Sequence, residues 1–215
     1  MEIRERIKQK ADELYRRYGV KSVTMDEIAS QLGVSKKTIY HSFSDKNELV
    51  DAVIVDMINT NRECCQHDRQ RSLNAIHEVY LAMEMLQVMF DNMNPSILFD
   101  IERNYPATFA KFKEYKYNFL FAMIKENIER GKKEELYRAE VNTDVAAKTR
   151  IETMLLPFNE ELFPKNRFSL ITVQQQLIEY FLFGIASLKG YELITNYQKE
   201  RSESYQSDNT RKNKT

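Results

Sequence analysis

Between Ser35 and His41 the sequence concentrates side chains that donate hydrogen bonds. The segment reads SKKTIYH and carries two ammonium groups, two aliphatic hydroxyls, a phenol and an imidazole. Proteins use such groups to contact phosphate oxygens and the edges of bases in duplex DNA. The pattern therefore predicts a nucleic-acid contact surface, and an ordinary solvated helix is the alternative.

The residues around this segment predict two short helices joined by a tight turn. Thr24 is placed to cap the first helix and Ser35 to cap the second. Gly33 permits the sharp turn because glycine enters the left-handed backbone region without steric cost. The small Ala29 lets the two helices cross closely, and Ile39 fills the crossing. This spacing predicts a helix-turn-helix, whose second helix enters the major groove of DNA.

Apolar residues recur at three- and four-residue spacing along most of the chain, which predicts an all-α fold. Five glycines and four prolines among 215 residues also favour long helices over a turn-rich β architecture. We expect helices over 3–18, 46 to about 64 and 73–92, a short segment over 96–103, then a long helix after Pro106 that closes at Gly131, and finally helices over 144–156 and 172 to about 198. The first of these would brace the helix-turn-helix as the third helix of that unit.

The stretch from Thr24 through GVSKKTIYHSF to Lys46 resembles the DNA-binding domain of TetR-type transcriptional regulators. The resemblance is close over about the first fifty residues and mainly architectural beyond them. It implies a helical subunit that dimerises, binds operator DNA and releases it when a small molecule enters the carboxyl-terminal domain. Many members of the family have glycine where Lys37 stands, so the contacts of this position are not carried over.

We expect two kinds of DNA contact from these residues. Phosphate contacts, which fix the register of the protein on the duplex, are assigned to Thr24, Ser35, Tyr40 and Lys46. Base-edge contacts are assigned to Lys36, Lys37, Thr38 and His41. A two-fold dimer would match a palindromic operator with half-sites about 34–36 Å apart. The partners expected are thus double-stranded operator DNA, a second copy of the chain and a small-molecule effector.

Methionine and aromatic residues concentrate in the middle of the chain, where they predict an apolar ligand pocket. Methionine adapts to ligands of several shapes, although a stripe of such residues at helical spacing also suits a plain core. The expected pocket residues are Met85, Met89, Phe90, Met93, Phe99, Phe112, Tyr115 and Phe119.

The last helical region mixes bulky residues with glycines, which allow close approach of helices. By the resemblance, a dimer interface would include Phe181, Gly184, Ile185 and Leu188. Packing within the subunit is the alternative.

Composition and charge suggest how the chain divides. Residues 1–50 hold ten Lys and Arg against eight Asp and Glu, whereas 51–197 hold seventeen against twenty-one. The segment with net positive charge is thus the one expected to contact DNA. We predict a DNA-binding domain over 1–46, a ligand-binding and dimerisation domain over 47–200, and a disordered tail over 201–215. The charged amino end and the absence of a long apolar run predict a soluble cytoplasmic protein without a membrane span.

The sequence lacks the motifs of common enzymes: a glycine-rich phosphate loop, HExxH, GxSxG and paired cysteines at metal spacing. We therefore expect no catalytic residues, no metal and no cofactor. Two alternatives remain open. Cys64 and Cys65, with His67 nearby, could make the chain a redox- or metal-responsive regulator, and a helical bundle could carry an enzyme whose polar site has no motif.

Overall fold

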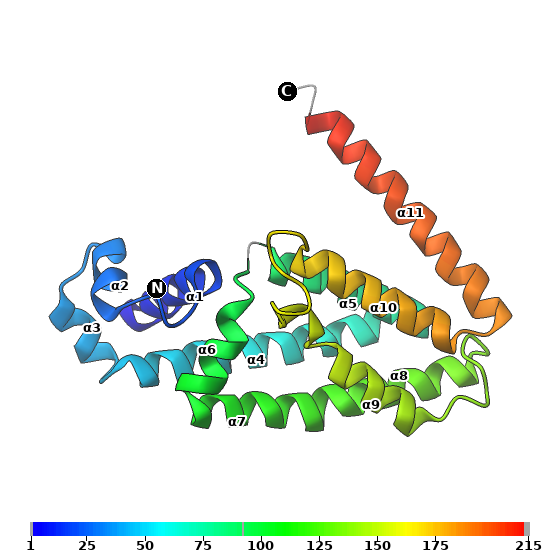
Figure 1. The fold of residues 1–215 in the computed structure, drawn as a ribbon, viewed down its shortest axis with the longest axis horizontal. Helices are drawn as coiled ribbons and strands as arrows, with labels where there is room; N and C mark the ends of the chain where they lie inside the picture. The colour runs from blue at the N-terminus through cyan, green and yellow to red at the C-terminus, as the bar shows by residue number, and fades with distance from the viewer. Residues whose placement is uncertain (1, 92, 213–215) are drawn as a thin grey trace.

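The computed structural model describes residues 2–91 and 93–212, with side chains described through Arg201, and the elements of this part of the chain are helical (Figure 1). The predicted all-α class is therefore confirmed. The elements are α1 (Ile3–Tyr18), α2 (Met25–Leu32), α3 (Lys36–Ser42), α4 (Lys46–Arg71), α5 (Ala75–Phe90), α6 (Ser96–Asn104), α7 (Pro106–Glu114), the π-helix η1 (Tyr115–Leu120), α8 (Phe121–Lys133), α9 (Thr143–Thr153), the 3₁₀-helix η2 (Leu156–Phe158), α10 (Leu170–Ile185) and α11 (Leu188–Lys212). Within the described residues, no helix combines the length and the apolar composition that crossing a bilayer requires.

Helices α1 to α3 form a small unit at one end of the molecule (Figure 1). Thr24 Oγ1 accepts the Glu27 N–H at the start of α2, and Gly33 ends that helix with a left-handed φ of 66°. Buried residues of α1 brace the pair from behind, although Tyr18, the last residue of the helix, is 44% exposed. The predicted helix-turn-helix is present.

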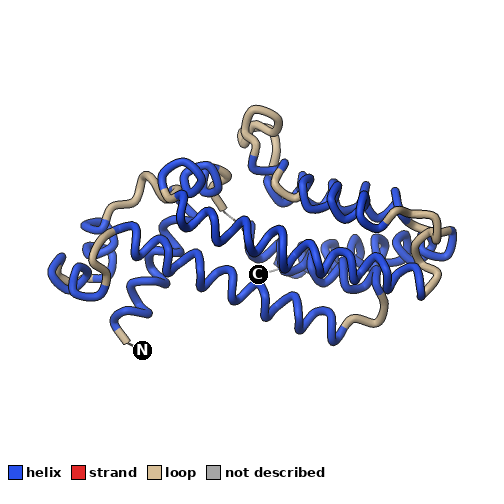
Figure 2. Tube along the Cα trace, turned by 90° about the horizontal axis from the view of Figure 1, so that it is seen from below, coloured by secondary structure: helices blue, strands red, loops and turns tan. Residues whose placement is uncertain are grey.

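Helix α4 continues to Arg71, seven residues beyond the expected end near Cys64. Neither glycine nor proline interrupts this stretch, and Arg69 and Arg71 in the last turn favour the negative end of the helix dipole. Figure 1 shows α4 running from the small unit into the rest of the bundle, and the tube of Figure 2 is helical over most of its course.

The long helix expected after Pro106 is a rod of three segments, α7, η1 and α8. The sequence predicts that this helix ends at Gly131, whereas it continues to Lys133. Gly131 lies inside α8, where a Cβ would come within 2.1 Å of the Tyr137 ring. Close packing of that ring, rather than termination of the helix, therefore explains the glycine.

The single helix expected from 172 to about 198 is two helices, because the chain breaks at Ala186 and Ser187. Here Arg138 N–H donates to the Ile185 carbonyl, and Ser187 N–H donates to the Leu136 carbonyl, both at 2.9 Å. These bonds to the loop after α8 replace the intrahelical ones.

Helix α11 continues through Lys212, so residues 201–212 are helical where the sequence predicts a disordered tail. Adding residues to an existing helix costs less than nucleating one, and the first half of α11 is held by a Tyr197 hydrogen bond and ring contacts to α5. Residues 213–215 lie outside the described residues.

Candidate nucleic-acid interface and ligand cavity

Helix α3 exposes one polar face and buries one apolar residue. Ile39 is fully buried in the crossing with α2, whereas Lys36, Lys37, Tyr40 and His41 are exposed. The side chains predicted to contact DNA therefore share one surface at the end of the molecule.

Hydroxyl groups fix the start of this helix. Ser35 Oγ accepts the Thr38 N–H at 3.1 Å and lies 2.8 Å from Thr38 Oγ1. Thr24, at the start of α2, is exposed as well. Each capping oxygen already accepts from a backbone amide, so the proton of Thr24 is available for donation to a phosphate oxygen. Ser35 and Thr38 use one hydroxyl proton in their mutual contact, and the other is available for a phosphate.

The two lysines of α3 have different surroundings. Lys36 Nζ lies 2.8 Å from Asp26 Oδ1 on α2, and this contact raises the pKa of the lysine. Lys37 has no acidic partner among the described residues. A DNA phosphate or base would compete with Asp26 for Lys36 but would meet Lys37 without such competition.

Lys46, like Thr38, is only partly exposed. Its Nζ donates to the Val20 carbonyl at 2.6 Å and so ties α4 to the loop before α2. Burial lowers the pKa of this ammonium. In this structure the ammonium group therefore stabilises the packing of α4 against the loop before α2, and its contact with DNA stays a prediction.

The carboxyl-terminal bundle encloses a cavity of about 210 Å³. Its wall includes six of the eight predicted pocket residues: Met85, Met89, Phe90, Met93, Phe112 and Tyr115. Phe99 is wrong as a pocket residue, since it is 58% exposed with Arg103 over its ring. Phe119 is also absent from the wall, and its ring stacks on Tyr115 under the Arg62 guanidinium instead.

Sequence reasoning missed the charged and amide residues of the cavity wall, among them Arg150 and Gln174. Arg150 on α9 is 8% exposed, and Gln174 on α10 is 1% exposed. A signal for both exists in the sequence: Arg150 follows Ala147 by three residues, and Gln174 precedes Ile178 by four. Helical spacing thus puts each on the apolar stripe of its helix, where a polar side chain is unusual.

Two connections join the cavity to the small unit. The first is α4, whose early turns contribute Leu49 and Val53 to the core and whose later turns contribute Met57 and Asn61 to the cavity wall.

The second connection runs through α5, α6 and the end of α1. Lys21 N–H donates to Asp100 on α6 at 2.9 Å, and Arg16 donates to the Met89 carbonyl at 3.0 Å. A Cβ at Gly19 would lie 2.8 Å from Ser96 Oγ, so these segments touch closely. Met89 also lines the cavity, so the residue that accepts the hydrogen bond from Arg16 is one that a ligand in the cavity would contact.

The predicted dimer residues fall into two groups. Gly184 and Leu188 lie on the surface, and Leu188 is 78% exposed. Ile185 is buried within the subunit, and Phe181 lines the cavity, so neither presents its side chain fully to a second copy. Tyr180 and Tyr191, which are 66% and 55% exposed, extend the surface of α10 and α11 around Gly184.

In the described part of the chain, neither cysteine forms a disulfide or belongs to a metal-binding group. Cys64 and Cys65 are free, and no group of three described His, Cys, Asp or Glu side chains could hold a metal ion. Burial raises the pKa of Cys65 to about 11. Because the thiolate is the reactive form of cysteine, this environment disfavours a redox role.

Comparison with known proteins agrees with the geometry. Residues 7–53 match the family model described as "Bacterial regulatory proteins, tetR family". The HTH-type transcriptional regulator YvaF of Bacillus subtilis is 24% identical over 173 residues, which are 77% of this chain and 87% of that protein.

Solved structures share the fold over most of the chain. The ketosteroid transcriptional regulator KstR2 of Mycobacterium tuberculosis superposes with a TM-score of 0.62 at 16% identity, over 86% of this chain and 96% of that one. A transcriptional regulator from Saccharomonospora viridis in complex with choline gives a TM-score of 0.68 at 19% identity, over 86% and 97%. These proteins are described as transcriptional regulators, the class that the sequence predicts for this chain.

Proposed function

Because this chain belongs to the TetR family of DNA-binding transcriptional regulators, we propose that it is a dimeric repressor released from its operator by a small molecule. The single observation that carries the proposal is the course of α4. The first turns of this helix supply core residues to the small unit of α1 to α3, and its later turns supply wall residues to the cavity.

Helix α3 enters the major groove in this proposal. Lys37, Thr38 and His41, with Lys36 when it leaves Asp26, approach base edges and supply specificity. The exposed hydroxyls of Thr24, Ser35 and Tyr40 hold phosphates and fix the register. Lys46 reaches a phosphate only by releasing the Val20 carbonyl.

The second copy packs against the exposed surface of α10 and α11. We assign Tyr180, Gly184, Leu188 and Tyr191 to this interface, since they offer apolar area with a glycine at which helices approach closely. An interface there puts two copies of α3 on one side of the dimer, where a palindromic operator presents two half-sites.

A ligand in the cavity acts on α3 through α4 and through the contacts of α6 with Gly19 and Lys21. The ligand must bind the DNA-free arrangement more tightly than the DNA-bound one, because equal binding shifts no equilibrium. The structure of a similar regulator in complex with choline supports the idea that a protein of this fold binds a small molecule.

The experiment is selection of bound duplexes from a randomised pool by the full chain at low salt, with analytical ultracentrifugation of the same sample. The proposal expects a dimer and an enriched palindrome with half-sites about one helical turn apart. The double substitution Tyr180→Glu and Leu188→Glu should yield monomers that enrich nothing. Enrichment by a monomer, or a dimer that selects no sequence, would refute the proposal.

A further inference from the structure

The polar groups of the cavity wall fall into satisfied and unsatisfied sets. Glu78 Oε2 lies 3.1 Å from an Arg130 nitrogen, and Asp68 Oδ1 lies 3.0 Å from Arg71 Nε. Asn127 donates to a backbone carbonyl and accepts from the Tyr137 hydroxyl. Each of these groups therefore has a partner from the protein.

Arg150 and Gln174 form the unsatisfied set. Arg150 Nη1 and both amide atoms of Gln174 are buried without a hydrogen-bond partner in the described part of the chain. A buried polar group without a partner is unfavourable, and a buried charged group without one is more so. The chain satisfies another buried cation, since Lys116 lies 3.1 Å from Glu152 Oε2, so lack of a partner is specific to Arg150.

The Arg150 group is a cation. Burial lowers the pKa of its guanidinium to about 10, which leaves it protonated at neutral pH, and no nearby acidic group offsets the burial. Apart from Asn61, Cys65 and the polar groups named above, the wall consists of methionine, aliphatic and aromatic side chains. A buried cation in apolar surroundings is stabilised best by an anion that forms hydrogen bonds with it.

We propose that the effector is a monocarboxylate with a compact apolar body, held by Arg150 through its carboxylate and by Gln174 through a second polar contact. This inference rests on the proposed ligand-released function. One unpaired positive charge matches one negative charge, whereas a phosphate would bring a second one into an apolar space. The Gln174 amide offers a donor and an acceptor, which suits a carboxylate oxygen beside a hydroxyl or an N–H.

The size of the cavity limits the apolar body. The cavity of about 210 Å³ exceeds the engineered apolar cavity of roughly 150 Å³ that binds benzene. Aromatic acids of one ring and short straight-chain acids fit this size. Met85, Met89 and Met93 can adjust their side chains to either shape.

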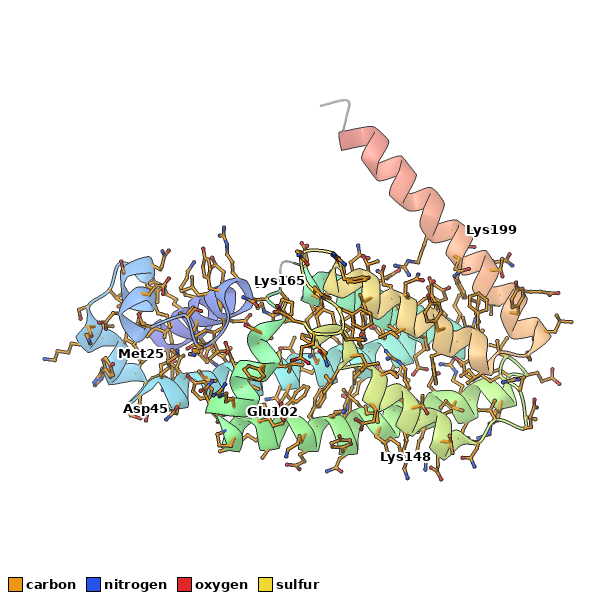
Figure 3. The ribbon with its side chains drawn as sticks, viewed as in Figure 1. Met25, Asp45, Glu102, Lys148, Lys165 and Lys199 are labelled. Carbon is orange, nitrogen blue, oxygen red and sulfur yellow. The ribbon has the colours of Figure 1, made fainter. Side chains whose placement is uncertain are left out.

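The test is titration calorimetry of the full chain with benzoate, phenylacetate, hexanoate and octanoate, each beside the corresponding primary alcohol and amine. At least one acid should bind roughly ten- to a hundredfold more tightly than its alcohol and amine, the value of a charge-assisted contact. Arg150→Met should abolish this preference, and Arg150→Lys should keep part of it. Lys148→Met should change nothing, since Lys148 lies exposed on the outer side of the same helix (Figure 3).

Three outcomes would overturn the inference: alcohols or amines that bind as tightly as the acids, an acid preference that survives in Arg150→Met, or no acid that binds. Thermal unfolding of Arg150→Met establishes that the variant is folded, and Gln174→Leu provides a second variant with a smaller expected loss. Release of DNA by a neutral or cationic compound would leave the proposed function standing while this inference fails. An acid that binds through Arg150 without affecting DNA would refute ligand release and keep the carboxylate site.

Discussion

The surface of α3 and the cavity of the carboxyl-terminal bundle both carry cations, in opposite settings. Lys36 lies on the surface beside Asp26, and solvent reaches both side chains. Arg150 lies among apolar side chains without an acidic partner in the described residues. A surface charge costs little to maintain, whereas a buried unpaired charge is unfavourable until something neutralises it.

This difference teaches how the two regions recognise their partners. The α3 surface meets a polyanion whose attraction is long-ranged and weakened by salt, so many exposed donors suffice. In the proposed function the cavity takes one small molecule, so its selectivity depends on the few unsatisfied polar groups of a largely apolar wall. The crossing of α2 and α3 is therefore closely packed, while the cavity is hollow and its wall holds buried polar groups without a partner in the described residues.

The largest expected effect tests the contrast in packing. Ile39→Ala should lower the free energy of unfolding by about 2–5 kcal/mol, because Ile39 is fully buried where α2 and α3 cross. Met85→Ala should cost less, since its side chain is partly buried and already borders the cavity. Chemical denaturation of both variants measures the difference. Equal losses would mean that the bundle is packed as tightly as the small unit.

A second prediction concerns the two cations. Arg150→Met should raise the free energy of unfolding of the ligand-free protein by about 1–3 kcal/mol. A pKa lowered from 12.5 to about 10 corresponds to roughly 3 kcal/mol of unfavourable burial. Lys36→Met should leave stability nearly unchanged. If Arg150→Met is destabilising in the absence of ligand, the guanidinium has a favourable partner and the contrast fails.

A third prediction sharpens the role of the α3 surface. Lys37→Ala should change the relative affinity for operators with different bases by about tenfold, because a base contact is lost. The matched control Lys148→Ala, on the exposed side of α9, should bind each operator with the affinity of the parent protein. Fluorescence anisotropy at fixed salt over a panel of single-base operator variants provides the comparison. A uniform loss for Lys37→Ala would assign this lysine to phosphate instead.

The smallest expected effect concerns Glu48, a surface carboxylate with hydrogen-bond and ion-pair partners. Glu48 accepts from Ser44 N–H and Ser44 Oγ and contacts Arg4, which lowers the pKa of its carboxyl to about 2. A depressed acid pKa adds stability above the ordinary value near 4.5, and this is lost as pH falls toward 2. Glu48→Gln should therefore lose stability at pH 7 and show a shallower acid limb in urea unfolding. A slope like that of the parent would exclude this role, and Glu114→Gln, at an exposed site on α7, is the control.

The small unit could be predicted from the sequence because its determinants are local. The caps by Thr24 and Ser35 and the left-handed Gly33 each act within four residues, and the structure has all three. Most pocket methionines and aromatics could be predicted for a similar reason, since apolar spacing marks the inward face of a helix.

The failures come from contacts between distant segments. The break at Ala186 depends on hydrogen bonds from the loop after α8, and Gly131 is explained by the Tyr137 ring. Arg150 and Gln174 were missed because their meaning appears only when α9 and α10 close over the cavity. Helical spacing could have marked them as polar residues on apolar stripes, although it does not reveal that they lack partners.

The measurement that tests the account most directly joins the two regions in one titration. A labelled operator from the duplex selection is held at constant salt with the full chain, and the acid that binds most tightly in calorimetry is added. The account predicts that anisotropy falls to the value of free DNA for the parent and for Lys148→Met, and that Arg150→Met keeps the operator bound at the same acid concentration. Equal release from all three proteins, or no release from the parent, would contradict it.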